Sequence, residues 1–181
     1  VVNLCIDFLE NRTDKKTVDL CSGSGAIAVA LDKISGAKVT AVEIDETAFS
    51  YLETNVKENN SSVKPVMADA LEICETFADG ELDLIVSNPP YIKSADIETL
   101  QKEIRLEPRL ALDGGEDGCD FYREIVSRWS RKLKNGGALA FELGENPTDA
   151  VKALMTDKGF SDFKISLDFG GVQRAIIGTL L

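Results

Sequence analysis

Residues 17–34 read TVDLCSGSGAIAVALDKI, an apolar strand that runs into a glycine loop and continues as a helix. The apolar run predicts a strand over 17–20, and the apolar spacing that follows predicts a helix over 26–34. Small loop residues let the backbone approach a ligand closely, and the free amides at the start of the helix favour polar or anionic groups. A tight turn without any ligand is the alternative for this segment taken alone.

The rest of the sequence repeats this alternation of short apolar strands and longer amphipathic segments. The last two strands are separated only by residues 169–173, so a hairpin joins them and one of the two runs antiparallel to the other strands. The pattern predicts a single α/β domain over residues 1–181, with a doubly wound, Rossmann-like sheet of about seven strands. The further strands are expected over 38–44, 63–68, 82–87, 138–143, 163–168 and 174–180, and the further helices over 1–12, 46–59, 121–133 and from Pro147 onward.

The segment after the fourth strand is expected to be irregular and polar as far as about Asp120. Within it, residues 113–124 come close to a calcium-binding loop but fail at its third position. Pro108 and an extended course over 109–112 argue against the helix that should precede such a loop, so we predict no metal. The helix that follows is expected to end at residues 135–137, Asn-Gly-Gly, as a left-handed cap.

The composition excludes several kinds of chemistry. The 181 residues include no histidine, which removes Ser-His-Asp and Cys-His catalysis and histidine-ligated zinc. The four cysteines form no CxxC pair, which disfavours a zinc ribbon or a disulfide framework. A net charge of −11 disfavours a nucleic-acid partner, because phosphate-binding proteins usually carry a basic face. No apolar run reaches the roughly 18 to 20 residues of a membrane span, and the first residues do not resemble a signal peptide, so we expect a cytoplasmic protein without a membrane partner.

Acidic residues follow two successive strands, at the edge where doubly wound sheets bind their ligands. Glu43 ends the second strand, where a carboxylate can accept hydrogen bonds from both hydroxyls of a ribose. This suits NAD and S-adenosylmethionine equally, and Gly23 and Gly25 also fit a loose dinucleotide fingerprint. Asp69 follows the third strand and can accept from an adenine amino group. Each acid taken singly is equally well explained as a solvated loop residue, but their placement after successive strands favours a site.

The segment Asn88-Pro89-Pro90-Tyr91, which follows the fourth strand, separates these two cofactors. Two prolines restrict the backbone and remove two N–H donors, which leaves free carbonyls beside the Asn88 side chain. The Asn88 side-chain oxygen and the Pro89 carbonyl can each accept one N–H of an amide or amino group, and the Tyr91 ring can pack against a planar substrate. An amide nitrogen is a poor nucleophile, so holding it in line with a methyl donor supplies the activation. A dehydrogenase has no use for this arrangement, and a rigid proline turn is the remaining alternative.

Four motifs together resemble a known family. DLCSGSGAIAVAL, AVEID, DLIVSNPPYI and EPRLALDGGEDGCDFYREI have the order and spacing of the HemK-type glutamine N5-methyltransferases, which modify peptide-chain release factors. The resemblance runs from about Leu4 to the end. It implies a class I methyltransferase fold, S-adenosylmethionine as cofactor, and the glutamine of a release-factor Gly-Gly-Gln motif as the methylated group. NPPY also occurs in enzymes that methylate exocyclic amines of ribosomal RNA or DNA bases, which is the alternative function.

The resemblance also implies roles for individual residues. Asn88, Pro89 and Tyr91 would be catalytic, and the same residues with Pro90 would bind the glutamine. The cofactor-binding residues that it implies are Asp19, Cys21, Ser22, Gly23, Ser24, Gly25, Glu43, Asp69, Ala70 and Asn88.

The chain departs from the family pattern at several positions. Cys21 stands where glycine is usual, Glu43 where aspartate is common, and Ala70 where a larger side chain often covers the adenine. The family's small N-terminal helical domain has no counterpart in these residues. We therefore expect a catalytic domain that binds cofactor but methylates a release factor poorly. A cofactor-binding scaffold without catalysis is a third alternative.

Overall fold

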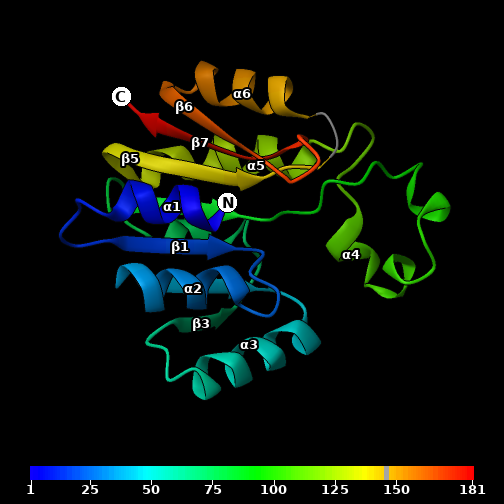
Figure 1. Cartoon of the computed structure of the whole chain (residues 1–181), viewed down its shortest axis with the longest axis horizontal. Coiled ribbons are helices and arrows are strands. Elements are labelled where there is room, and N and C mark those ends of the chain that lie inside the picture. The colour runs from blue at the N-terminus through cyan, green and yellow to red at the C-terminus, as the bar shows by residue number, and fades with distance from the viewer. Residues whose placement is uncertain (145–146) are drawn as a thin grey trace.

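A computed structural model describes residues 1–144 and 147–181 of the chain. They form one seven-stranded sheet in the order β3-β2-β1-β4-β5-β7-β6 (Figure 1). Strands β1 to β5 run parallel, and β7 runs antiparallel to both of its neighbours, β5 and β6. The predicted seven-stranded α/β sheet and its antiparallel member are confirmed. The strands span Lys16–Leu20 (β1), Lys38–Glu43 (β2), Lys64–Met67 (β3), Leu82–Ser87 (β4), Leu133–Glu142 (β5), Phe160–Leu167 (β6) and Gln173–Leu180 (β7).

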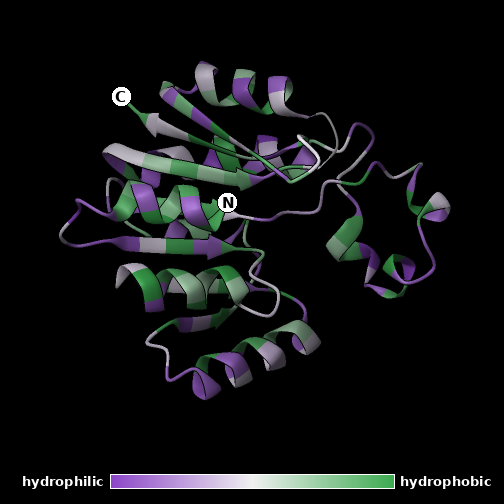
Figure 2. Cartoon of the chain, in the orientation of Figure 1, coloured by the Kyte–Doolittle hydropathy of each residue, from purple (hydrophilic) through white to green (hydrophobic). Residues whose placement is uncertain are grey.

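Helices cover both faces of this sheet. Leu84 and Val86 of β4 pack with residues of α1, α2 and α3, whereas Ile85 of the same strand packs with residues of α5 and α6. Alternate residues of a strand face opposite sides, so β4 is buried along its whole length and apolar on both faces. In Figure 2 the strands at the centre carry many hydrophobic residues, whereas α3 at the edge is largely hydrophilic. The helices span Val2–Leu9 (α1), Ala26–Ser35 (α2), Glu46–Glu58 (α3), Arg109–Leu112 (α4), Asp120–Trp129 (α5) and Thr148–Asp157 (α6), with 3-10 turns at Ile73–Thr76 (η1), Ile97–Thr99 (η2), Ile104–Leu106 (η3) and Ser130–Lys132 (η4). Among the described residues, no helix has both the length and the apolar character needed to cross a bilayer.

The end of α5 differs from the sequence prediction. The helix ends at Trp129 and η4 follows it, so Leu133 begins β5 instead of closing a helix. The expected cap at 135–137 is wrong, because these residues lie within β5 where its register against β4 shifts. Gly136 has a φ of +74° there. The glycine therefore permits a bulge in a strand, which needs the same left-handed conformation as a helix cap.

The extended course expected for residues 109–112 is also wrong, because they form the short helix α4. Asp113 N donates to the Arg109 carbonyl at 2.9 Å and closes this turn. Pro108 immediately precedes the helix, a place where its missing N–H costs nothing. Pro147 likewise stands just before α6 and not at its first helical position.

A long segment, residues 93–112, projects away from the sheet and carries η2, η3 and α4 (Figure 1). We call it the excursion. Its two ends pair with each other in an isolated bridge: Ile92 N donates to the Leu112 carbonyl at 2.9 Å, and Gly114 N donates to the Ile92 carbonyl at 2.8 Å. The excursion is therefore closed at its base although its middle stands apart from the strands.

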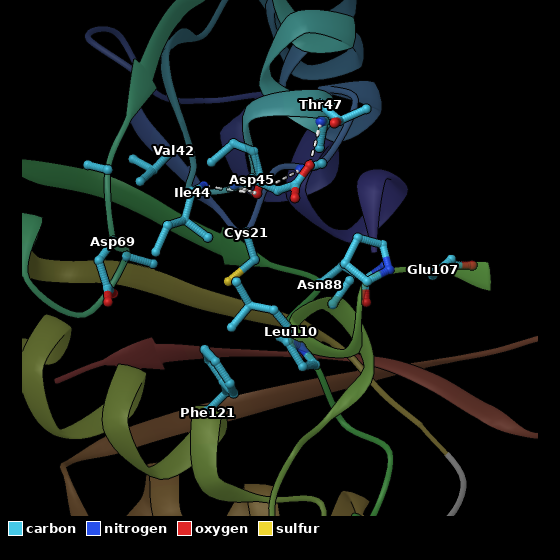
Figure 3. A pocket seen from close by; sticks show the side chains of 18 of the residues that line it. Cys21, Val42, Ile44, Asp45, Thr47, Asp69, Asn88, Glu107, Leu110 and Phe121 are labelled. Carbon is cyan, nitrogen blue, oxygen red and sulfur yellow. Dashed lines mark hydrogen bonds between the residues drawn. The ribbon is translucent and has the colours of Figure 1, made fainter. Parts of the chain in front are cut away.

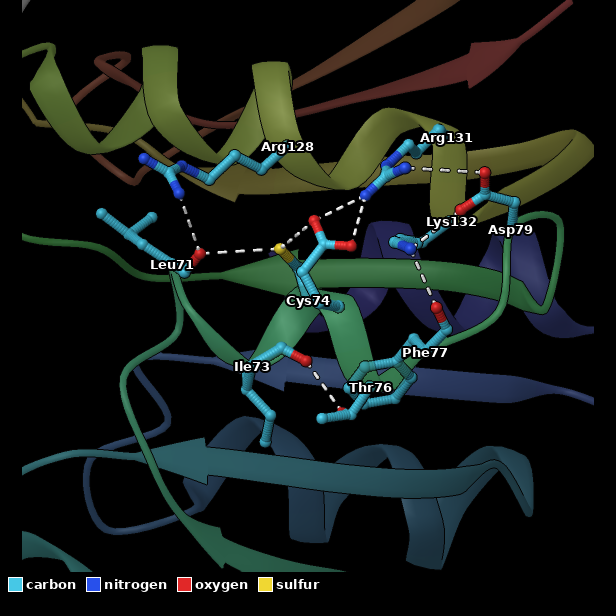
Figure 4. Close-up of polar contacts among 10 residues, drawn as sticks. Leu71, Ile73, Cys74, Thr76, Phe77, Asp79, Arg128, Arg131 and Lys132 are labelled. Carbon is cyan, nitrogen blue, oxygen red and sulfur yellow. Dashed lines mark hydrogen bonds and ion pairs between the residues drawn. The ribbon is translucent and has the colours of Figure 1, made fainter.

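Polar contacts tie the segment after β3 to the end of α5 (Figure 4). The buried Lys132 ammonium donates to the Phe77 carbonyl and to Asp79 Oδ1, both at 2.8 Å. The Trp129 indole N–H donates to the Ala70 carbonyl at 2.9 Å. These contacts hold the loop that follows β3 against α5 and η4, on one face of the sheet.

Candidate active site

A cavity of about 590 Å³ opens at the carboxyl ends of β1, β2, β3 and β4 (Figure 3). The start of α3 and the excursion form its other walls. In doubly wound sheets this edge is where ligands bind. Of the residues predicted from the sequence, the cavity is lined by Cys21, Gly23, Glu43, Asp69, Ala70, Asn88 and Pro90.

The glycine loop after β1 is held against the end of β2. Ser22 N and Ser22 Oγ both donate to one β2 carbonyl, at 3.0 and 3.1 Å. Gly25 has a φ of +81°, which favours glycine, and a Cβ there would lie 2.3 Å from the end of the Leu52 side chain of α3. Gly23 has a φ of +54°, and a Cβ there would meet no atom within 4 Å, so this glycine borders open space. Ser22, Ser24 and Gly25 therefore shape the loop, and Gly23 faces the cavity.

Glu43 joins the ends of β1 and β2. Its Oε2 accepts from Gly23 N at 2.7 Å, and its Oε1 accepts from Ile44 N at 2.9 Å and Asp45 N at 2.8 Å. The side chain is almost fully buried but still reaches the cavity wall. A carboxylate oxygen can accept two hydrogen bonds, so Oε2 retains capacity for a ligand hydroxyl. Glu43 is thus both an organiser of the glycine loop and a candidate ligand contact.

Asp19 lies beneath the loop and not in the cavity wall. It is completely buried, and its Oδ2 accepts from Ala28 N at 3.1 Å near the start of α2. Its Oδ1 has no hydrogen-bond partner among the described residues. The pKa of this carboxyl is raised to about 8, mainly by burial and in part by the nearby Glu43 charge, while the Ala28 hydrogen bond lowers it. Asp19 is therefore placed to support the loop from below.

Cys21 adopts the backbone conformation of the glycine that it replaces. Its φ is +56°, a backbone conformation that residues other than glycine rarely adopt. Its thiol lies in the cavity wall (Figure 3). Burial raises the pKa of this thiol to about 12, so it is neutral and contributes an apolar surface.

The loop after β3 supplies another wall. Asp69 Oδ1 accepts from Leu71 N at 2.7 Å, which closes a tight turn of the backbone. Asp69, Ala70 and Leu71 all line the cavity, and Phe121 of α5 lies in the same wall. This combination of one carboxylate with flat and apolar side chains suits a heteroaromatic ring that carries an amino group.

Only some residues of the segment after β4 reach the cavity. Asn88 is exposed and lines the cavity together with Pro90, while Pro89 is buried and does not line it. Tyr91 also lies outside the cavity wall, half-buried beside Gly144, where a Cβ would come within 2.5 Å of Tyr91 Cδ2. Ser87 Oγ donates to the Leu20 carbonyl at 2.8 Å and fixes the start of the segment to β1.

The sequence reasoning missed the walls that face these strand ends. Large apolar side chains at the mouth are notably exposed: 62% for Tyr51, 79% for Leu106 and 53% for Leu110. Apolar residues within an otherwise polar stretch were the available signal, since a surface that exposes them often binds a ligand or partner. The missed residues of these facing walls are Asp45, Thr47, Ala48 and Tyr51 of the α3 region, Leu106, Glu107, Pro108, Leu110 and Ala111 of the excursion, and Phe121 of α5.

A glycine loop, an acid after the second strand and a cavity at the switch point of a doubly wound sheet define a cofactor-binding α/β enzyme. Residues 2–116 match the family described as "Methyltransferase small domain", and the chain belongs to this family. A crystal structure of a methyltransferase from Pyrococcus furiosus has a similar fold, with a TM-score of 0.72 and 24% identity over 98% of this chain and 82% of that one. This likeness confirms the predicted class I methyltransferase fold.

Curated relatives are more specific. A release factor glutamine methyltransferase of Geobacter sulfurreducens is 41% identical over 90% of this chain. A protein of the same name from Clostridium acetobutylicum is 34% identical over 98% of this chain. The chain spans 57% and 63% of the lengths of these two relatives. Their names confirm the resemblance that the four motifs indicate.

Proposed function

We propose that the protein transfers a methyl group from S-adenosylmethionine to the side-chain amide of the glutamine in a release-factor Gly-Gly-Gln motif. The observation that carries this proposal is the exposed Asn88, which lies with Pro90 in the wall of a cavity bordered by the Gly23 loop. A group that accepts amide N–H bonds thus adjoins a site for a small cofactor. The names of the curated relatives support the same activity.

The cavity fits S-adenosylmethionine in size and chemistry. Its volume of about 590 Å³ lies within the range of small-molecule sites. Gly23 leaves open space that a side chain would fill, so a ligand can approach the backbone there. The remaining acceptor capacity of Glu43 Oε2 suits a ribose hydroxyl, and Asp69 suits an adenine amino group. Cys21 and Ala70 would add apolar contacts.

When bound, S-adenosylmethionine would supply an electrophilic methyl group. The Asn88 side-chain oxygen and the Pro89 carbonyl would each accept one N–H of the substrate amide and so hold its nitrogen toward that methyl. Proline has no N–H, so neither Pro89 nor Pro90 offers a backbone donor that would compete for these carbonyls. Catalysis would come mainly from orientation, which reduces the entropic part of the barrier. The surplus proton of the product would leave to solvent or to a backbone carbonyl.

Methyl transfer to defined acceptors tests the proposal. The purified protein is incubated with labelled S-adenosylmethionine and, separately, a release factor, ribosomal RNA or DNA. We expect label in the release factor, at the Gly-Gly-Gln glutamine when mapped by mass spectrometry, and none when that glutamine is replaced by asparagine. Label in RNA or DNA alone would support base methylation instead. Cofactor binding without transfer to any acceptor would identify a scaffold.

A further inference from the structure

Three glycines approach Tyr91 more closely than any other residue type could. A Cβ on Gly144 would lie 2.5 Å from Tyr91 Cδ2, against the ring. A Cβ on Gly114 would lie 2.7 Å from Tyr91 Cα, and one on Gly118 would lie 2.6 Å from the Tyr91 carbonyl oxygen. Real Cβ atoms do not approach other heavy atoms within 3.0 Å. The ring, the Cα and the carbonyl of one tyrosine are therefore each packed against a glycine.

Two of these glycines belong to the segment 113–118, which is itself fixed by hydrogen bonds. Asp113 Oδ1 accepts from Ser94 Oγ at 2.5 Å and from Gly115 N at 3.1 Å, and Ser94 N donates to the Gly115 carbonyl at 2.9 Å. Gly114 N donates to the carbonyl of Ile92, which is the residue after Tyr91. The segment is thus held on both sides of its closest approach to Tyr91.

The acids of this segment serve the same turn. Asp117 Oδ1 accepts from Cys119 N at 3.0 Å and from Arg123 Nη1 at 3.1 Å. Arg109 donates to Asp113 Oδ2 at 3.0 Å. In the pattern that resembles a calcium loop, the carboxylates at the first and fifth positions, Asp113 and Asp117, therefore accept hydrogen bonds from backbone amides and arginines. Its aspartates hold a turn in shape.

We propose that Gly114, Gly118 and Gly144 form a clasp that positions Tyr91, and through it the Pro89 carbonyl, for the substrate amide. The inference rests on the proposed function and adds three positioning residues to it. Ser87 ties the start of the segment to β1 by a 2.8 Å hydrogen bond, and the clasp holds its end. Between these two points the prolines leave little backbone freedom. The Pro89 carbonyl is thereby fixed before substrate arrives.

The clasp lies outside the cofactor cavity, because neither Tyr91 nor any of the three glycines lines it. It therefore makes a specific kinetic prediction. Disturbing the clasp should lower kcat for amide methylation and leave cofactor affinity unchanged, because a misplacement of about 1 Å can cost up to about 100-fold in rate.

Gly144→Ala and Gly114→Ala are the sharpest variants, because neither glycine has a left-handed φ and alanine brings only the steric contact. We expect each to lower kcat by about 10- to 100-fold, with the calorimetric Kd for S-adenosylmethionine unchanged. The two should differ in a Tyr91→Ala background. That change removes the ring atoms that Gly144 meets, so Gly144→Ala should then have no further effect, whereas Gly114→Ala should still lower kcat because it meets the Tyr91 backbone.

Gly178→Ala is the matched control. Its Cβ would meet Phe163 Cε1 at 2.6 Å, an equally close contact with an aromatic ring, but in the β6–β7 pair and outside the cavity. We expect it to lower the Tm and to leave kcat unchanged while the protein is folded. An equal fall of kcat in Gly178→Ala would show that any loss of stability has this effect, and would overturn the proposal.

A readout that does not depend on turnover separates this inference from the proposed function. Fluorotyrosine incorporated at the three tyrosines gives separate ¹⁹F signals, with that of Tyr91 assigned from Tyr91→Phe. The Tyr91 signal should shift in Gly144→Ala and Gly114→Ala and stay unchanged in Gly178→Ala. An unshifted signal would overturn the clasp even in an active enzyme. A shifted signal in a protein that methylates no release factor would retain the clasp and reject the proposed function.

Discussion

Glu43 Oε2 accepts a hydrogen bond from Gly23 N at 2.7 Å, which joins the end of β2 to the glycine loop after β1. The same carboxylate accepts from Ile44 N and Asp45 N through its other oxygen. One buried side chain therefore sets the shape of the loop and borders the cavity. A change at Glu43 should affect ligand binding in two ways: it removes a side chain that borders the ligand cavity, and it releases the glycine loop from the end of β2.

Replacement of Glu43 by alanine should weaken S-adenosylmethionine binding by about 1 to 3 kcal/mol, the usual scale for hydrogen bonds to a charged group. Calorimetry with S-adenosylmethionine and its demethylated product measures this, and NAD should not bind the wild-type protein. Glu58→Ala, at an exposed position at the end of α3, is the control and should bind normally. Binding of NAD as tight as that of S-adenosylmethionine would refute the cofactor assignment.

Asp19 should make stability depend on pH. Burial raises the pKa of this carboxyl from 3.8 to about 8, so the folded protein holds the proton more tightly than the unfolded chain. The stabilisation from that proton is fully present below pH 3.8 and is lost as the pH rises through about 8. Asp19→Asn, which resembles the protonated acid, should therefore be more stable than wild type at about pH 9 and similar to it at about pH 4. Urea unfolding at both values tests this, and a difference that does not change with pH would contradict it.

Asn88 should contribute to kcat more than to cofactor binding. Asn88→Ala removes one proposed acceptor and keeps the two prolines, and loss of one positioned hydrogen bond typically costs about 10² to 10³ in kcat. Asn88→Asp retains an acceptor of similar shape but adds a negative charge beside a cationic cofactor, so binding should survive while kcat falls. Steady-state kinetics on a release factor, with calorimetry for the cofactor, separates the two effects. If Asn88→Ala retained the wild-type kcat, the proposed role of Asn88 would be wrong and the segment 88–91 would be only a rigid turn.

Lys132 should matter for stability. Its buried ammonium donates to the Phe77 carbonyl and to Asp79 (Figure 4). Lys132→Met fills a similar volume but leaves that carbonyl without its donor, which should lower the free energy of unfolding by about 1 to 3 kcal/mol. Lys158→Met, at an exposed position after α6, should be nearly neutral. Equal unfolding midpoints in urea for the two variants would show that the Lys132 contacts contribute nothing.

Much of the fold could be predicted from the sequence because its signals are local. The strand over residues 82–87 (LDLIVS) is apolar at four of its six positions, and the structure has β4 at the same bounds. The errors fell where one residue type serves two structures. Gly136 was expected to cap a helix, but its left-handed φ permits a bulge within β5. Local chemistry does not distinguish these, because the difference depends on how β5 pairs with β4.

The candidate site divides in the same way. By itself the sequence determined which residues follow each parallel strand, and parallel strands bring their carboxyl ends to one edge, so Glu43, Asp69 and Asn88 reach one cavity. The tertiary structure alone decided that Asp19 is buried under the loop, that the excursion forms a cavity wall, and that Gly144 packs on Tyr91. Burial and close approach between residues distant in the chain depend on packing, which no local spacing of residue types specifies.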